Sequence, residues 1–266
     1  MTVDFFKEIL TEPALKDFEF LRLDEGEIDA ECLDLVMETA HSNRDLFISG
    51  TKVPKDYYHE NAFKFYDIFY GSAEWVRLEQ LFTLTDRFSV YLGVHSLTSS
   101  DVNNYIKFWI DNDHDMVLYL RIAMRSFKPE LLFDGIVVLE ARRRPVYFFA
   151  ANPKKQKKHQ IMSVIWFNEQ VILSSDAVSL IDSDSGQPIV IECRKPEYKV
   201  LMILNKKKEL EEELEEIQNL LETNQDQNMI EKKDEISKEL QSVSADLDNY
   251  NLVFRNGTYI YTETQK

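Results

Sequence analysis

The sequence predicts an α/β protein: a degenerate, leucine-rich-repeat-like αβ solenoid with an appended small antiparallel sheet and a charged helical hairpin. Three observations support this prediction. Short β-rich runs alternate with segments of helical period over residues 1–140, strand-like runs dominate 141–204, and charged residues crowd 205–247. A C-terminal β-hairpin is expected over 248–266, because Asn256-Gly257 stands between two apolar runs.

The repeat-like region is indicated by the spacing of its expected strands. Their centres fall at Phe20, Leu46, Tyr66, Tyr91 and Tyr119, in steps of 26, 20, 25 and 28 residues. These steps lie in the range of leucine-rich repeats, in which each strand and its return helix bury their apolar faces by stacking on a neighbour. The asparagine ladder of standard repeats is missing, so an ordinary α/β sheet with the same element order is the alternative.

The clearest helix of this region follows Thr98, which is a good N-cap residue. Its apolar side chains recur at positions i, i+3, i+4 and i+7, and they are Val102, Tyr105, Ile106 and Trp109. The third strand is expected over the aromatic run 63–70.

The appended sheet is indicated by a series of short apolar runs. We expect strands over 146–150, 161–167, 171–173, 189–193 and 200–204. A basic loop separates the first two of these strands, and residues 182–186 (DSDSG) are expected to form a turn.

The segment 205–247 has six lysines and thirteen acids, which is a charge of 6 − 13 = −7. Two apolar series at helical spacing predict an antiparallel helical hairpin: Leu210, Leu214, Ile217, Leu221 and Ile236, Leu240, Val243, Leu247. Two interpretations stay open at this point. The hairpin is either a solvated protrusion stabilised by ion pairs, or a coiled-coil arm that recruits a partner helix through Leu210, Leu214, Ile217 and Leu221.

Composition excludes several classes of protein. The 266 residues carry 31 basic and 47 acidic side chains, a net charge of −16, which disfavours binding to nucleic acid or to an anionic membrane. Two cysteines are too few for a disulfide scaffold. The sequence shows no signal peptide and no apolar stretch of membrane-spanning length, so we expect an intracellular protein, cytoplasmic or nuclear.

Catalytic motifs are not recognisable. The five histidines are scattered without zinc-binding spacing, and no phosphate-binding loop or nucleophile elbow occurs. Cys32 and Cys193 lie in apolar patterns and are expected to be small buried hydrophobic residues. We therefore expect no catalytic, cofactor-binding or metal-binding residue, no cofactor, and no enzymatic activity.

Two charged clusters allow more than one interpretation. Asp111, Asp113 and Asp115 resemble the start of a calcium loop, but Met116 replaces the required glycine, so a solvated turn is favoured. Seven basic residues lie within seventeen positions: Arg142, Arg143, Arg144, Lys154, Lys155, Lys157 and Lys158. We favour a solvated loop that balances the acidic helices over a docking patch for an acidic partner, because no aromatic residue interleaves with the four lysines.

Several runs of the first half occur in a recognisable order. They are 46–54 (LFISGTKVP), 73–76 (AEWV), 97–110 (LTSSDVNNYIKFWI), 118–122 (LYLRI) and 129–136 (PELLFDGI). Their order and spacing resemble the F-box-associated domain (second type) of nematode F-box proteins, well over residues 40–140 and loosely over 175–204. The most specific element is the run L-T-x-x-D-V-N-x-x-[IL]-K-x-W.

The resemblance implies a leucine-rich-repeat-like receptor surface that, in full-length relatives, selects substrates for a cullin–RING ubiquitin ligase. We expect the chain to lack its own F-box, which disfavours direct binding to the ligase adaptor. The leading hypothesis is therefore a non-catalytic protein-interaction module with a protein partner and no membrane contact. The alternatives are a coiled-coil assembly protein and an enzyme whose site is too dispersed to recognise.

Overall fold

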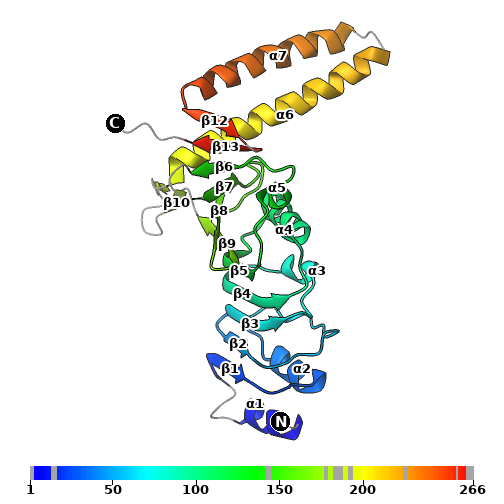
Figure 1. Ribbon diagram of the computed structural model, residues 1–266, viewed down its shortest axis with the longest axis vertical. Coiled ribbons are helices and arrows are strands. Elements are labelled where there is room, and N and C mark those ends of the chain that lie inside the picture. The colour runs from blue at the N-terminus through cyan, green and yellow to red at the C-terminus, as the bar shows by residue number, and fades with distance from the viewer. Residues whose placement is uncertain are drawn as a thin grey trace. The chain divides into compact units, whose positions relative to one another are not determined.

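The computed structural model describes residues 3–12, 17–141, 145–176, 179–181, 188–190, 194–223, 227–255 and 257–261 (Figure 1). The chain forms two compact units. The N-terminal unit comprises 1–134 and 151–177, and the C-terminal unit comprises 135–150 and 178–266. This division differs from the predicted segments 1–140 and 141–204, because residues 151–177 return to the N-terminal unit.

The N-terminal unit is built on a mixed sheet. Its strands are β1 (Phe20–Asp24), β2 (Asp45–Ser49), β3 (Asp67–Ala73), β4 (Arg87–His95), β5 (Val117–Ala123), β8 (Ile161–Phe167) and β9 (Gln170–Asp176). Strands β1 to β5 are parallel and lie side by side in chain order. Strand β9 then pairs antiparallel with β5, and β8 pairs antiparallel with β9.

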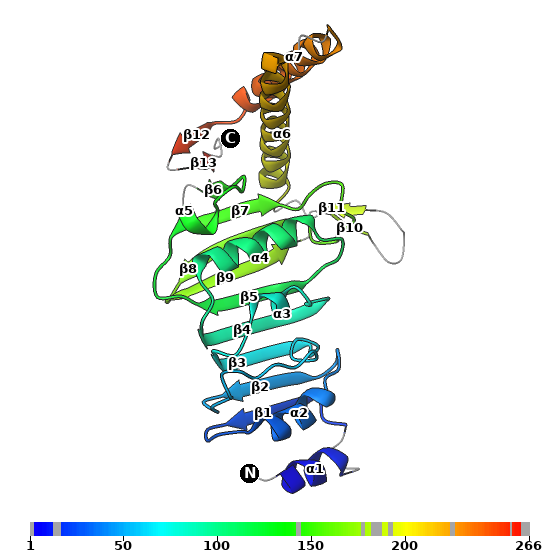
Figure 2. The ribbon, with the colours of Figure 1, turned by 90° about the vertical axis from the view of Figure 1, so that its right-hand side faces the viewer.

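One face of this sheet is covered by helices. The connections include α2 (Ala30–Glu38), α3 (Leu78–Leu81), α4 (Ser99–Asp111) and α5 (Pro129–Leu132), and α1 (Val3–Thr11) packs against α2. Helices α2, α3 and α4 lie on the same side of the strands in Figure 2. The strands alternate accordingly: in β2 Leu46 and Ile48 are fully buried, whereas their neighbours remain partly exposed.

The sequence run around helix α4, residues 97–109, has two structural roles. The Thr98 hydroxyl accepts a hydrogen bond from the Asp101 backbone N–H, and the Asp101 carboxylate accepts one from the Thr98 N–H, which makes a capping box. The buried Asn103 amide donates to the carbonyl oxygens of Leu132 and Asp134, at 2.9 and 3.1 Å. The motif thus begins one helix and fixes the next one to it.

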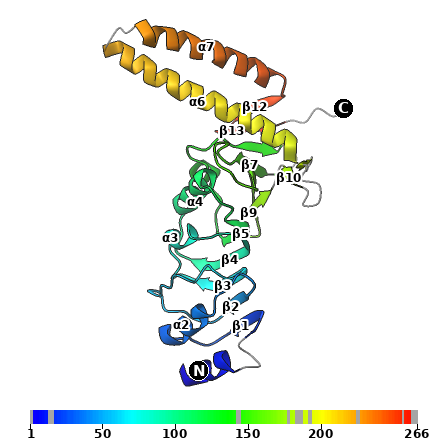
Figure 3. The same cartoon turned by 180° about the vertical axis from the view of Figure 1, so that it is seen from behind.

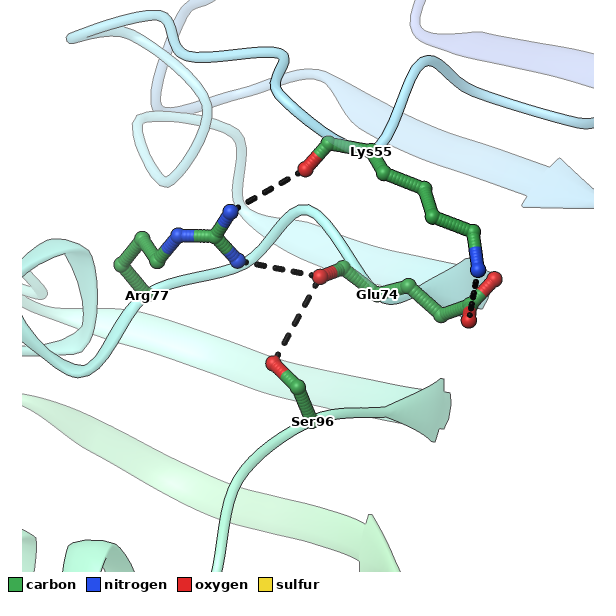
Figure 4. Close-up of polar contacts among 4 residues, drawn as sticks. All are labelled: Lys55, Glu74, Arg77 and Ser96. Carbon is green, nitrogen blue, oxygen red and sulfur yellow. Dashed lines mark hydrogen bonds and ion pairs between the residues drawn. The ribbon is translucent and has the colours of Figure 1, made fainter.

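The connections that follow β2, β3 and β4 are tied together through main-chain oxygens (Figure 4). The Arg77 guanidinium donates to the carbonyl oxygens of Lys55, at 3.1 Å, and Glu74, at 3.0 Å. The Ser96 hydroxyl donates to the same Glu74 oxygen, and Lys55 pairs with the Glu74 carboxylate at 2.8 Å. Three successive connections therefore share one polar cluster.

Two glycines allow neighbouring strands to come close: Gly93 brings β4 near β3, and Gly71 brings β3 near β2. A Cβ atom on Gly93 would lie 2.2 Å from the carbonyl oxygen of Gly71, and one on Gly71 would lie 3.3 Å from the Ile48 oxygen. A side chain at position 93 would therefore clash with the backbone of Gly71 and force β3 and β4 apart.

The structure of this unit differs from what the sequence predicted in two places. Strand β3 spans Asp67–Ala73, so only the second half of the predicted run 63–70 belongs to the strand. Phe63 and Phe65, in the first half, are buried in the turn that precedes β3. The helix α1 was not predicted, since its nine residues are too few to show a clear period.

The C-terminal unit contains a second set of strands. They are β6 (Leu139–Ala141), β7 (Val146–Ala150), β12 (Leu252–Arg255) and β13 (Thr258–Tyr261), in the order β7-β6-β13-β12. Strands β12 and β13 form the expected C-terminal hairpin, and β13 pairs parallel with β6. A separate antiparallel pair is made by β10 (Ser179–Ile181) and β11 (Pro188–Val190).

Two long helices complete this unit (Figure 3): α6 (Lys195–Thr223) and α7 (Gln227–Asp248). The strand predicted over 200–204 is wrong, because these residues belong to α6. Val200, Leu201 and Leu204 are buried, at the i, i+1, i+4 spacing of a helix that packs on β7. A five-residue apolar run does not reveal its period, so strand and buried helix cannot be distinguished from it.

The helices α6 and α7 pack on each other through their apolar stripes. Leu210, Ile217 and Ile236 are buried together, and Leu214, Leu221, Met229, Leu240 and Val243 pack around them. Ion pairs Lys206–Glu239, at 3.0 Å, and Lys232–Glu213, at 2.6 Å, cross between the helices. Leu210, Leu214, Ile217 and Leu221, which were considered for recruiting a partner helix, therefore pack inside the hairpin between α6 and α7.

Candidate functional site

The sheet face that the helices leave uncovered carries a row of aromatic side chains. Cross-strand register places Phe47 beside Phe69, and Phe69 beside Tyr91. Ring centroids lie 5.6 Å apart in the first pair and 4.4 Å apart in the second, and Phe20 of β1 joins the row at 4.9 Å from Phe47. We call Phe20, Phe47, Phe69 and Tyr91 the aromatic ladder.

The rings of the ladder stand against one another. The interplanar angle is 2° between Phe47 and Phe69 and 13° between Phe69 and Tyr91, so both pairs are stacked along the direction that crosses the strands. Stacked rings cover each other's faces and turn their edges toward solvent. The ladder therefore offers apolar ring edges for contact, and its inner rings have no free face on which a nucleic-acid base or a sugar could stack.

A polar row runs beside the ladder on the same face. Phe20, Asp45, Asp67, Ser89 and Tyr119 are in register across β1 to β5. Phe20 and Tyr119 at its ends are 48% and 42% exposed, whereas Asp45 and Asp67 are half-buried and Ser89 is buried. The row thus places two half-buried carboxylates between exposed aromatic rings at its ends.

Burial dominates the electrostatics of this row. Burial, reinforced by the charge of Asp67, raises the pKa of Asp45 above its ordinary value. Burial also raises the pKa of Asp67, although the Ser89 hydroxyl and the charge of Arg121 oppose this effect. Arg121 in turn donates to the Ser89 hydroxyl at 3.3 Å. The guanidinium of Arg121 therefore lies near the β5 end of the row, and its charge acts on Asp67 but is not among the influences on Asp45.

The two charged clusters singled out in the sequence pair with each other. Lys155 forms an ion pair with Asp113 at 3.1 Å, and the backbone N–H groups of Lys158 and His159 donate to the Asp115 carboxylate. The His159 ring also meets Asp115 at 2.9 Å. Burial raises the pKa of Asp115, but these bonds from His159 outweigh it and hold the pKa below the ordinary value.

Lys157 is the most enclosed member of the basic loop. Its ammonium donates to the backbone carbonyl of Trp109 and lies 3.9 Å from the centre of the Trp109 ring. Only 6% of the residue is exposed. The loop 152–159 is therefore docked on the end of α4 and on the acidic turn, and the favoured interpretation of a wholly solvated loop is wrong for Lys157.

Several sequence candidates lie outside the described residues, namely Arg142, Arg143, Arg144, the turn 182–186 and Cys193. Cys32 is fully buried in α2, and burial raises the pKa of its thiol to about 11, which suits a core residue and not a nucleophile.

Two pockets of the N-terminal unit contain titratable side chains. One of about 170 Å³ at the start of β4 and β5 is lined by Arg87, Phe88, Lys158 and His159. Another of about 380 Å³ at the ends of these strands is lined by His95, Arg125 and Glu169. Burial lowers the pKa of His95, whose ring nitrogen Nε2 is 2.6 Å from the Ala123 carbonyl oxygen.

Among the described residues, no group of three or more His, Cys, Asp or Glu side chains is arranged to hold a metal ion. None of the helices in the same residues combines the length and apolar character needed to cross a membrane. No family model, curated protein or solved structure matches this chain.

The aromatic ladder was not identified from the sequence, although a signal for it exists. Phe47, Phe69 and Tyr91 are separated by 69 − 47 = 22 and 91 − 69 = 22 residues, and each is flanked on both sides by a core residue of its strand. A constant spacing of outward-facing aromatic residues in successive strands predicts a continuous row.

Proposed function

We propose that this chain is a non-catalytic protein-interaction module whose binding surface is the aromatic ladder. The observation that carries the proposal is the ladder itself: Phe20, Phe47, Phe69 and Tyr91 form a continuous apolar row on a sheet face that no helix of the N-terminal unit covers. A contiguous apolar patch on a protein surface often marks a site at which another molecule binds.

A leucine-rich-repeat-like architecture is part of this proposal. Parallel strands in chain order, helices on one face and connections tied through Arg77 support it, because each unit then stacks on the one before. The exposed strand face of such a solenoid is an extended surface that binds by contact, without an activated side chain.

The chemistry of the ladder favours a protein partner over nucleic acid or carbohydrate. Its inner ring faces are occupied by one another, and the adjacent row contributes two carboxylates, which repel phosphate. Apolar side chains of a peptide pack well against ring edges.

The resemblance to the F-box-associated domain suggests a biological setting for this surface, namely the choice of substrates for a cullin–RING ubiquitin ligase. Residues 97–109 support the resemblance by a structural role, since Thr98 and Asp101 cap α4 and Asn103 fixes α5. Family membership and the ligase setting remain part of the proposal, as does an intracellular location.

The proposal is tested by affinity capture from lysate with three baits: wild type, Phe69→Ala and Phe254→Ala. Phe254 is 63% exposed in the C-terminal unit and serves as the matched control. We expect a set of proteins retained by wild type and by Phe254→Ala and lost with Phe69→Ala. Capture that is equal for all three baits would contradict a role for the ladder.

The same captures are scored for cullin and adaptor subunits. Their presence among the proteins lost with Phe69→Ala supports the ligase setting. Ladder-dependent proteins without these subunits would leave the interaction module intact and remove the ligase from the proposal.

A further inference from the structure

One end of the polar row beside the ladder has acidic side chains and no compensating cation. Asp45 is flanked by Asp67 and Glu19, and both of these charges disfavour its ionised form. Within the described residues, no lysine, arginine or histidine side chain forms an ion pair with Asp45.

The nearest arginines in the sequence are engaged elsewhere. Arg44, the chain neighbour of Asp45, donates to the Thr39 carbonyl at 2.8 Å and lies over the Phe18 ring at 4.6 Å. Arg22, in register with Phe47, pairs with Asp24 at 2.6 Å. Neither arginine therefore forms an ion pair with the Asp45 carboxylate.

The aromatic side chains around Asp45 complete the chemistry of a cation site. Phe20 is in register with Asp45 and nearly half exposed, and its ring is tilted by 46° to that of Phe47. Aromatic rings beside a carboxylate favour a cation on an aliphatic stem, because the stem packs on the rings while the charged head reaches the carboxylate. The net charge of −16 adds a long-range attraction for a basic partner.

We propose that the aromatic ladder binds an extended, basic peptide segment of its protein partner, with an arginine or lysine head on Asp45. The stem of that residue lies against Phe20 and Phe47, and apolar side chains of the same segment lie on Phe69 and Tyr91. The inference rests on the proposed function and specifies the chemistry of the partner.

The test is a selection of phage-displayed random heptapeptides on wild-type protein, followed by anisotropy measurements with fluorescein-labelled copies of the enriched peptides. Affinities are measured for wild type, Asp45→Asn, Phe69→Ala and Asp56→Asn. The asparagine at position 45 keeps an oxygen that can accept the hydrogen bond from the Asp67 backbone N–H. Asp56 is an exposed acid outside the ladder, so its variant makes the same change in net charge.

We expect enriched peptides to combine arginine or lysine with apolar residues. Binding should weaken about tenfold in Asp45→Asn, equivalent to roughly 1.4 kcal/mol, and stay unchanged in Asp56→Asn. Raising the salt concentration should weaken binding to wild type more than binding to Asp45→Asn. Circular dichroism of each variant establishes that the fold is retained.

The outcomes separate the two proposals. Peptides that require Phe69 but lack a basic residue, or that bind Asp45→Asn as well as wild type, overturn the basic-segment inference and leave the interaction surface standing. Peptides that bind equally to Phe69→Ala, or no enrichment at all, overturn both.

Discussion

The substitution Lys157→Met tests how the loop 152–159 is held. Burial lowers the pKa of Lys157 from 10.5 to about 8, although the charges of Asp115, Asp111 and Asp113 oppose the shift. The unfolded chain therefore binds more protons than the folded chain between about pH 8 and 10.5. The free energy of unfolding must rise with pH across that window, by at most about 1.4 kcal/mol per pH unit.

The methionine variant keeps an apolar stem of similar length and removes the titrating group. At pH 7 the variant loses the hydrogen bond to the Trp109 carbonyl, which contributes about 1–3 kcal/mol. It also no longer buries a charged ammonium, and this removes an unfavourable free energy of similar magnitude. We therefore expect a stability within about 1–2 kcal/mol of wild type at pH 7. At pH 10 the neutral amine of wild type still donates to the carbonyl, so wild type becomes the more stable protein.

The assay is urea unfolding of both proteins at pH 7, 8, 9 and 10, followed by circular dichroism. The difference in unfolding free energy, wild type minus variant, should increase steadily with pH. Parallel pH profiles would refute the burial of a titrating ammonium at this position. Lys155→Met is the control, because Lys155 is a neighbouring loop lysine that is only partly buried and pairs with Asp113.

Three further predictions concern the fold. Gly93→Ala should destabilise the protein by more than about 2 kcal/mol, because its Cβ would meet the Gly71 backbone oxygen, whereas Gly71→Ala should cost less; thermal unfolding of both variants checks this order. Asn103→Ala should lower the unfolding free energy by about 2 kcal/mol, since the buried Leu132 carbonyl and the partly buried Asp134 carbonyl lose their donor, and equal stability to wild type in urea would contradict it. Ile236→Ala should cost about 2–4 kcal/mol and speed amide hydrogen exchange in α6 and α7, while Leu220→Ala, at a half-exposed position, should leave exchange unchanged.

Local signals in the sequence predicted much of the N-terminal unit. The apolar period and the Thr98 cap of α4 were both correct, because cap and core residues lie within one short segment. The strands around Leu46, Tyr91 and Tyr119 were found for the same reason, since their buried and exposed residues alternate.

Features that depend on distant residues were missed. The acidic turn at 111–115 and the loop lysines at 154–158 were assessed separately, and only the fold brings Asp113 to Lys155. The run 200–204 was assigned to a strand, because five apolar residues fit either a strand or a buried helix. The ladder depends on register between strands, which the sequence expresses only as a repeated spacing.

The cluster around Arg77 has a consequence for which amino-acid replacements the sequence can accept during evolution. Its guanidinium donates only to main-chain oxygens in the contacts of Figure 4, and every amino acid carries such an oxygen. Positions 55 and 74 can therefore accept many replacements while both bonds persist, provided that the arginine stays. Descendants of this sequence can diverge widely in that region and still hold the same three connections together.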